Sequence, residues 1–143
     1  MALIAVCLAG CASSTVHIAD VSNDPRFAGT YRPGEVWRLK RDGYLVYSRD
    51  QGLELSAISE PDAIQVYAGS VVRIERLGYL FNSEHPPVAS GPTEVVLAYG
   101  TLTDAKGQKW EVAVLPALRS GRRVEGTSLF VYPPDRELLE PAS

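Results

Sequence analysis

Histidine and cysteine, the side chains that most often carry out chemistry, are scarce in this sequence. The 143 residues include two of each, and His17 lies in a polar segment near the N-terminus. His85, between Glu84 and Pro86, could serve as a general base or a metal ligand. The sequence has no His-x-x-x-His or Cys-x-x-Cys spacing and no Gly-x-Ser-x-Gly motif. We therefore expect a non-enzymatic protein with no metal and no cofactor.

The two cysteines lie at the N-terminus, Cys7 inside an apolar run over residues 2–9 and Cys11 just after it. The run matches the core of a signal peptide and is far shorter than the roughly 20 residues of a membrane-spanning helix. It ends in Leu8-Ala9-Gly10-Cys11, which resembles the lipobox of bacterial lipoproteins. The resemblance implies that residues 1–10 are a cleaved export signal and that the Cys11 thiol carries a diacylglycerol.

The lipoprotein resemblance also implies a location. It places the chain in the bacterial cell envelope, attached to a membrane through the lipid anchor at Cys11. Because Ala12 replaces the Asp that favours inner-membrane retention, we expect the outer membrane, facing the periplasm. With Cys7 discarded and Cys11 lipidated, no thiol remains for a disulfide.

Composition and patterning predict one folded domain after the signal. Residues 11–25 are small and polar, which is typical of a lipidated flexible tether. We expect a β-domain over residues 26–134 and a C-terminal tail over residues 135–143. The net charge of −3 gives no electrostatic reason to expect nucleic acid as a partner.

Short runs with alternating polarity, separated by turn residues, predict β-strands. Val72 and Ile74 should share a buried face, and Trp110 should be among the most buried residues, on a face with Val112 and Val114. Turns at residues 41–43 and 104–107 predict two hairpins. The predicted strands cover residues 35–40, 44–48, 53–58, 64–67, 70–77, 94–102, 108–115 and 126–132.

This pattern predicts an all-β domain of about six to eight short antiparallel strands. The run over residues 68–74, a Gly followed by alternating apolar residues, resembles a strand entry common in bacterial SH3-like domains. The resemblance implies a small SH3-like barrel. An immunoglobulin-like β-sandwich stays open as the alternative.

Aromatic side chains provide the candidate ligand-binding residues. Tyr44 and Tyr47 have odd spacing on one predicted strand, so they should point to opposite faces and one should be exposed. An exposed aromatic beside a long loop suits a binding groove. We therefore predict Tyr44, Tyr47 and His85 as ligand-binding residues.

Three functions remain open from the sequence. The first is a non-enzymatic lipoprotein whose β-domain binds an envelope protein or peptidoglycan. The second is an inhibitor or immunity-type lipoprotein that blocks an enzyme with a loop, such as the one carrying Ser120-Gly121. The third, a hydrolase, would depend on His85.

Overall fold

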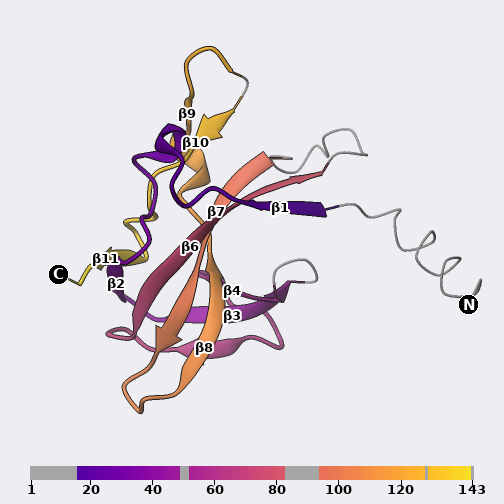
Figure 1. The fold of residues 1–143 in the computed structure, drawn as a ribbon. Coiled ribbons are helices and arrows are strands. Elements are labelled where there is room, and N and C mark those ends of the chain that lie inside the picture. The colour runs from indigo at the N-terminus through magenta and orange to yellow at the C-terminus, as the bar shows by residue number, and fades with distance from the viewer. Residues whose placement is uncertain (1–15, 49–51, 83–93, 128, 143) are drawn as a thin grey trace, which may run out of the picture.

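The computed structural model describes residues 16–48, 52–82, 94–127 and 129–142. These residues form eleven β-strands and two 3₁₀ turns (Figure 1). The elements are β1 (Val16–Asp20), η1 (Pro25–Phe27), β2 (Val36–Leu39), β3 (Gly43–Ser48), β4 (Gly52–Ser56), β5 (Ile64–Val66), β6 (Val71–Asn82), β7 (Glu94–Thr103), β8 (Lys109–Val114), η2 (Leu118–Ser120), β9 (Arg122–Arg123), β10 (Phe130–Val131) and β11 (Leu139–Pro141).

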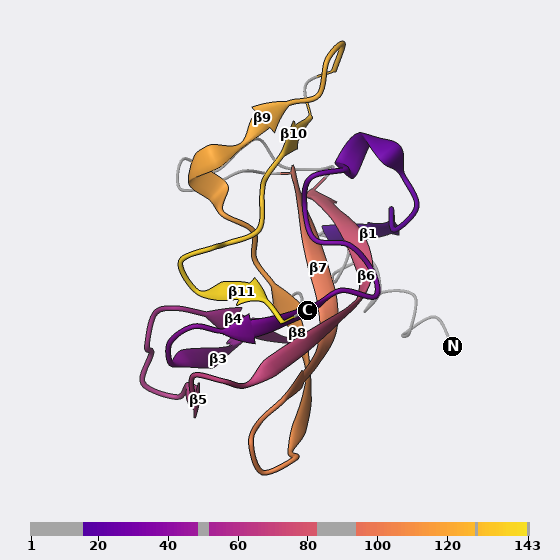
Figure 2. The same cartoon turned by 90° about the vertical axis from the view of Figure 1, so that its left-hand side faces the viewer.

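Nine of the strands form one sheet, in which eight follow the order β11-β2-β6-β7-β8-β4-β3-β5 and β1 also pairs with β6. The all-β prediction is confirmed. The two end strands, β11 and β5, do not pair, so the sheet is open rather than closed into a barrel. Its strong curvature makes β3 and β4 run across the direction of β7 (Figures 1 and 2). The expected six to eight strands are corrected to eleven in the described residues, because β1, β9 and β11 form in segments where no strand was expected.

One pairing departs from the antiparallel arrangement that we expected. β4 and β8 pair in parallel, whereas the other named strand pairs in the described chain are antiparallel. β3 and β4 form an antiparallel pair, and β4 of this pair lies next to β8 in the sheet (Figure 2). This single parallel contact positions the candidate site described below.

The longest strand, β6, pairs with three other strands of the sheet. One edge of β6 pairs first with β2 and then with β1, and the other edge pairs with β7 along nearly its whole length. The register with β7 shifts between Ile74 and Arg76, which marks a bulge where the strand bends. Gly100 lies opposite this bulge, and a Cβ there would overlap the carbonyl oxygen of Arg73. The close approach of the two backbones therefore requires glycine.

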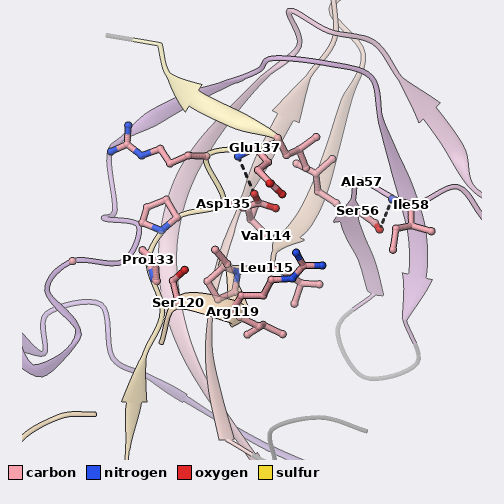
Figure 3. A pocket seen from close by; sticks show the side chains of 18 residues that line it. Ser56, Ala57, Ile58, Val114, Leu115, Arg119, Ser120, Pro133, Asp135 and Glu137 are labelled. Carbon is pink, nitrogen blue, oxygen red and sulfur yellow. Dashed lines mark hydrogen bonds between the residues drawn. The ribbon is translucent and has the colours of Figure 1, made fainter. Parts of the chain in front are cut away.

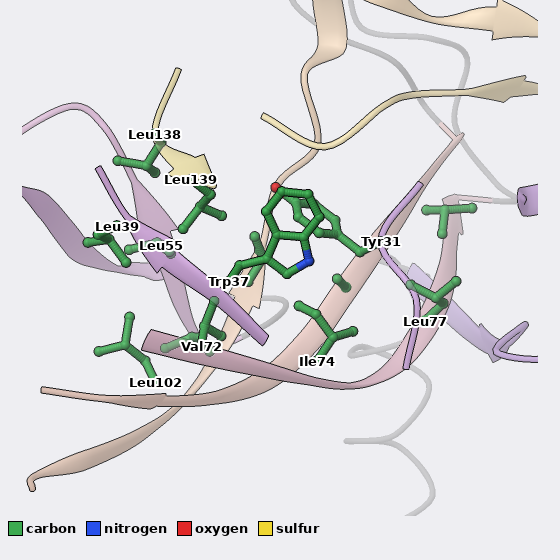
Figure 4. Close-up of a cluster of buried hydrophobic side chains, with 14 of the residues drawn as sticks. Tyr31, Trp37, Leu39, Leu55, Val72, Ile74, Leu77, Leu102, Leu138 and Leu139 are labelled. Carbon is green, nitrogen blue, oxygen red and sulfur yellow. The ribbon is translucent and has the colours of Figure 1, made fainter. Parts of the chain in front are cut away.

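The concave side of the sheet encloses the main hydrophobic core (Figure 4). Val72 and Ile74 are both buried, as their alternation with charged residues predicts. Trp37 lies at the centre with only 3% of its surface exposed. The prediction for Trp110 was wrong, because this residue is only partly buried against the core. Trp110 lies on β8 near the tip of the β7–β8 hairpin, beyond Ala113 and Val114, the two residues at which β8 pairs with β4.

Of the two predicted hairpins, one is confirmed and one is wrong. β7 and β8 pair directly across the turn over residues 104–107. β2 and β3 do not pair with each other, because β2 lies between β6 and β11 and β3 lies between β4 and β5. Gly43 does not adopt the left-handed conformation that a tight Asp-Gly hairpin turn requires. Asp42 instead accepts a hydrogen bond of 2.9 Å from the backbone N–H of Ala68, which holds a corner between the two halves of the sheet.

Both ends of the described chain belong to the sheet. We expected a tether over residues 11–25, but β1 pairs with the far end of β6, from Val16 opposite Asn82 to Asp20 opposite Gly78. We also expected a tail over residues 135–143, but β11 pairs with β2. The apolar pair Leu138 and Leu139 is buried in the core, which explains why this segment folds back. The β-domain therefore includes residues that we had assigned to the tether and the tail.

Candidate functional site

A groove opens where the parallel strands β4 and β8 separate (Figure 3). The two strands pair only at Glu54 with Ala113 and at Leu55 with Val114. Beyond these pairs the chains leave in different directions, and crevices commonly form at the carboxyl ends of neighbouring parallel strands. The cavity, which we call the β4–β8 groove, has a volume of about 740 Å³. Its walls are Gly29 and residues 55–58, 114–120 and 133–138.

The wall formed by residues 133–138 is held in place by hydrogen bonds to other segments of the chain. The backbone N–H of Ala117 donates to the carbonyl oxygen of Pro133 at 2.8 Å and joins this wall to the segment after β8. The backbone N–H of Asp135 donates to the hydroxyl oxygen of Tyr31 at 3.0 Å. Tyr31 is fully buried and packs edge-on against the ring of Trp37, with the ring centroids 5.2 Å apart. The core therefore fixes the position of this wall.

Arg136 belongs to the same wall, but its guanidinium contacts the core rather than the groove. It lies over the Trp37 ring, 5.1 Å from the ring centroid. The Arg136 carbonyl oxygen accepts a hydrogen bond of 2.9 Å from the Lys40 ammonium. In Figure 3 the groove side of this wall presents the carboxylates of Asp135 and Glu137.

The charged side chains that face the groove come from opposite walls. Arg119 extends from η2, and Asp135 and Glu137 lie together on the C-terminal segment (Figure 3). Asp135 Oδ1 accepts a hydrogen bond of 3.1 Å from the backbone N–H of Glu137. Within the described chain, no ion pair joins Arg119 to either carboxylate. The groove therefore presents a cation and carboxylates that do not neutralise each other.

The rest of the groove is largely apolar. Leu55 and Val114 are buried beneath it, and the segment after β8 adds Leu115 and Pro116. Ile58 stands at the rim with 71% of its surface exposed. An apolar surface with a few charged groups is the usual composition of a ligand site, and the volume lies within the typical range of about 300–1,000 Å³. The described lining contains neither histidine nor cysteine.

The structure does not bring the predicted binding residues to this groove. Tyr44 and Tyr47 both lie on β3 and point to opposite faces, as predicted, and Tyr47 is 76% exposed. Neither lines the groove. His85 lies outside the described residues, as do Cys11 and the rest of the lipobox. A ligand-binding role for Tyr44, Tyr47 and His85 stays a prediction.

A smaller pocket of about 280 Å³ lies on the convex side of the sheet and is lined by Tyr99. The Tyr99 ring covers Gly78, where a Cβ would stand 2.7 Å from a ring carbon. The guanidinium of Arg76 lies 4.1 Å from the ring centroid. The Tyr99 hydroxyl is buried with no hydrogen-bond partner among the described residues, and burial raises its pKa. We interpret this site as sheet packing in which Gly78 leaves room for the ring.

The described residues contain no group of three or more His, Cys, Asp or Glu side chains that could hold a metal ion. Among the same residues, no helix combines the length and the apolar character needed to cross a bilayer.

The chain matches no protein-family model, and no curated protein and no solved structure is significantly similar to it.

Sequence reasoning missed the residues that build the β4–β8 groove. Arg119 has no motif that marks it in the sequence, and Glu137 falls in the segment that we expected to be a tail. The prolines at positions 116, 133 and 134 were the available signal, because proline has a fixed φ and no backbone N–H and so interrupts strand pairing. Tyr31 had no such signal, since its hydroxyl meets Asp135 across 104 positions of sequence.

Replacing Tyr31 with Phe should change the alkaline stability of the protein. Burial raises the pKa of Tyr31, so the folded state keeps the phenol neutral while the unfolded chain ionises near pH 10. Stability is therefore fully present below about pH 10 and falls as the pH rises further, by about 1.4 kcal/mol per pH unit for this group. Urea unfolding between pH 8 and pH 11.5 should show a shallower alkaline decline in Tyr31→Phe than in wild type.

The exposed Tyr47 supplies the matched control for loss of a hydroxyl, because Tyr47→Phe changes a side chain that is 76% exposed and should leave the stability below pH 10 unchanged. Below pH 10, Tyr31→Phe should cost about 1–3 kcal/mol, since it leaves the Asp135 N–H without its acceptor. An alkaline slope equal to that of wild type would show that Tyr31 ionises in the folded protein.

Proposed function

We propose that the chain is a bacterial envelope lipoprotein, anchored through Cys11, whose β-domain binds an envelope partner in the β4–β8 groove. The lipid anchor would hold the β-domain at a membrane, and the groove would bind the partner. No chemical step is part of this function.

The observation that carries the proposal is the groove between β4 and β8. It combines an apolar floor with charges that have no ion-pair partner across it, and its C-terminal wall is held by the buried Tyr31. A wall fixed by the core keeps the site formed in the absence of ligand, and a preformed site loses less conformational entropy on binding. The lipobox-like segment supports the location independently of the groove.

The inhibitor function is the second candidate, and one feature favours it. The β9–β10 ribbon projects from the body of the domain (Figures 1 and 2). Phe130 on this ribbon is 41% exposed, and the guanidinium of Arg123 lies 5.8 Å from the centroid of its ring. A projecting ribbon with an exposed aromatic could enter the cleft of an enzyme. The hydrolase alternative depends on His85, and no described residue adds to it.

Site-specific photo-crosslinking in living cells tests the groove. A photoreactive phenylalanine at Ile58, on the rim of the groove, should give one discrete crosslinked product because a bound partner would cover this position. The same probe at Tyr47, which is similarly exposed but away from the groove, should give none. Loss of the Ile58 product when the groove is altered by Arg119→Glu would confirm that the partner occupies it.

A third probe position separates the two candidates. A discrete product from Phe130, with none from Ile58, would favour the inhibitor and contradict the groove. Equal products from Ile58 and Tyr47 would also contradict it, because they would indicate random collision.

A further inference from the structure

We infer that the β4–β8 groove recognises a short peptide that carries a free carboxylate and a free ammonium a few residues apart, as the peptide stems of the bacterial cell wall do. The inference rests on the proposed function and specifies the ligand of the same groove. It follows from the charges on the two walls and from the surface between them.

Arg119 is the only cation that the groove offers to a ligand among the described lining residues. The other arginine of the lining, Arg136, stacks on Trp37. Arg119 makes no ion pair or hydrogen bond within the described chain, so its planar guanidinium is available. Guanidinium groups bind carboxylates through two parallel hydrogen bonds, so this wall fits a carboxylate.

The opposite wall has the complementary chemistry. The backbone N–H of Glu137 donates a hydrogen bond to Asp135 Oδ1, which holds the Asp135 carboxylate against the Glu137 backbone, and both side chains line the groove. The Glu137 carboxylate has no ion-pair partner in the part of the chain that the structure describes. Two neighbouring carboxylates attract an ammonium group, which is a compact charge with three donors.

The combination favours ligands that carry both kinds of charge. A polyanion such as nucleic acid would be repelled by Asp135 and Glu137, and a ligand with cations alone would leave Arg119 without a partner. The apolar floor between the walls, which includes Leu115 and Pro116, favours a ligand with small apolar groups between its charges. A short peptide with a terminal carboxylate and a diamino residue has this pattern.

A wall peptide fits better than a segment of a folded protein for a geometric reason. Arg119 and the two carboxylates line one groove, which suits a ligand whose carboxylate and ammonium are close together. Cell-wall stems are short chains with a free end, whereas the body of a folded protein presents continuous backbone. The proposed anchoring in the envelope would also place the groove beside the wall.

The test is calorimetric titration of the full-length chain, purified in a non-ionic detergent, with a synthetic stem peptide of alternating stereochemistry. Three forms are compared: one with both charges free, one with the ammonium acetylated and one with the carboxylate amidated. We expect each modification to weaken binding by about threefold to tenfold, the range for partly exposed charge contacts. Modified peptides that bind as tightly as the free form, or a free form that does not bind, would overturn the inference.

Variants then assign each charge to its wall. Arg119→Gln should abolish the difference between the free and amidated peptides and keep the effect of acetylation. Glu137→Gln should do the reverse. Arg123→Gln and Glu125→Gln are the matched controls, because both residues are exposed and neither lines the groove, so both effects should persist.

Two further outcomes separate this inference from the proposed function. An all-L peptide of the same composition that binds as tightly as the stem peptide would overturn the assignment to the cell wall and point to a protein segment. A discrete crosslink from Ile58 together with no peptide binding would overturn the inference and leave the groove as a protein-binding site.

Discussion

Trp37→Ala should lower the free energy of unfolding by about 3–5 kcal/mol, the range for removing a large buried aromatic side chain. Trp37 is 3% exposed and lies between the Tyr31 ring and the guanidinium of Arg136. Its indole N–H also donates to Glu35 Oε1 at 3.2 Å. The substitution would leave a cavity behind the groove wall, so it should weaken binding in the groove as well as the fold.

Trp110→Ala is the matched control, because it removes the same side chain from a partly buried position. It should cost about 1–2 kcal/mol, since less apolar surface returns to water. Urea unfolding followed by far-ultraviolet circular dichroism measures both variants. Equal losses from the two substitutions would contradict the burial that the structure assigns to them.

Cys11→Ser should move the protein from the membrane fraction to the soluble fraction of the cell. On the proposed function, the thiol of Cys11 is the acceptor of the lipid, and a hydroxyl cannot replace it. Each buried methylene of an acyl chain contributes about 0.8 kcal/mol to membrane binding, so loss of the chains removes stable anchoring. Labelling with radioactive palmitate, followed by fractionation, measures the effect directly.

Cys7→Ser provides the control for this experiment. Cys7 lies within residues 1–10, the segment that the lipobox resemblance assigns to the cleaved signal, so its replacement should leave labelling and fractionation unchanged. Undiminished labelling of the Cys11→Ser variant would end the lipoprotein proposal. The β4–β8 groove would then need a different location for its partner.

Local patterns predicted the parts of the fold in which neighbouring residues determine the outcome. The alternation at Val72 and Ile74 identified the inward face of β6, and the turn over residues 104–107 identified the β7–β8 hairpin. β7 is apolar on both faces because Ala98 packs into the main core and Leu97 into the cluster on the convex side. These features depend on strand periodicity alone.

Distant pairings could not be predicted in the same way. The sequence around Asp42 and Gly43 is typical of a hairpin, but β2 forms its ladder with β6, whose residues are more than thirty positions away. The parallel contact between β4 and β8 has no local signature either. The groove depends on the β4–β8 pairing and on the hydrogen bond from Ala117 to Pro133. Neither can be predicted from the periodicity of the sequence, so the residues of the groove could not be identified in that way.

Trp110 shows a different limit. The alternation on β8 gave the correct face, since Val112 and Val114 are buried, but it did not show where the core ends along the strand. Depth along a strand is determined by which other strands reach that level. At the level of Trp110, β8 pairs with Leu102 on β7, whereas its pairing with β4 is confined to Ala113 and Val114.

The pairing of β1 with β6 limits how far the domain could travel from a membrane. If Cys11 carries the lipid, only residues 12–15 separate it from Val16, the first described residue, which pairs with Asn82 of β6. Five extended residues span at most about 17–18 Å, far less than the fifteen-residue tether that composition suggests. The domain would then remain next to its own bilayer and search for partners by diffusion in two dimensions. Partners held at the same surface would meet it at a high effective concentration, whereas targets on the opposite membrane would lie beyond its reach.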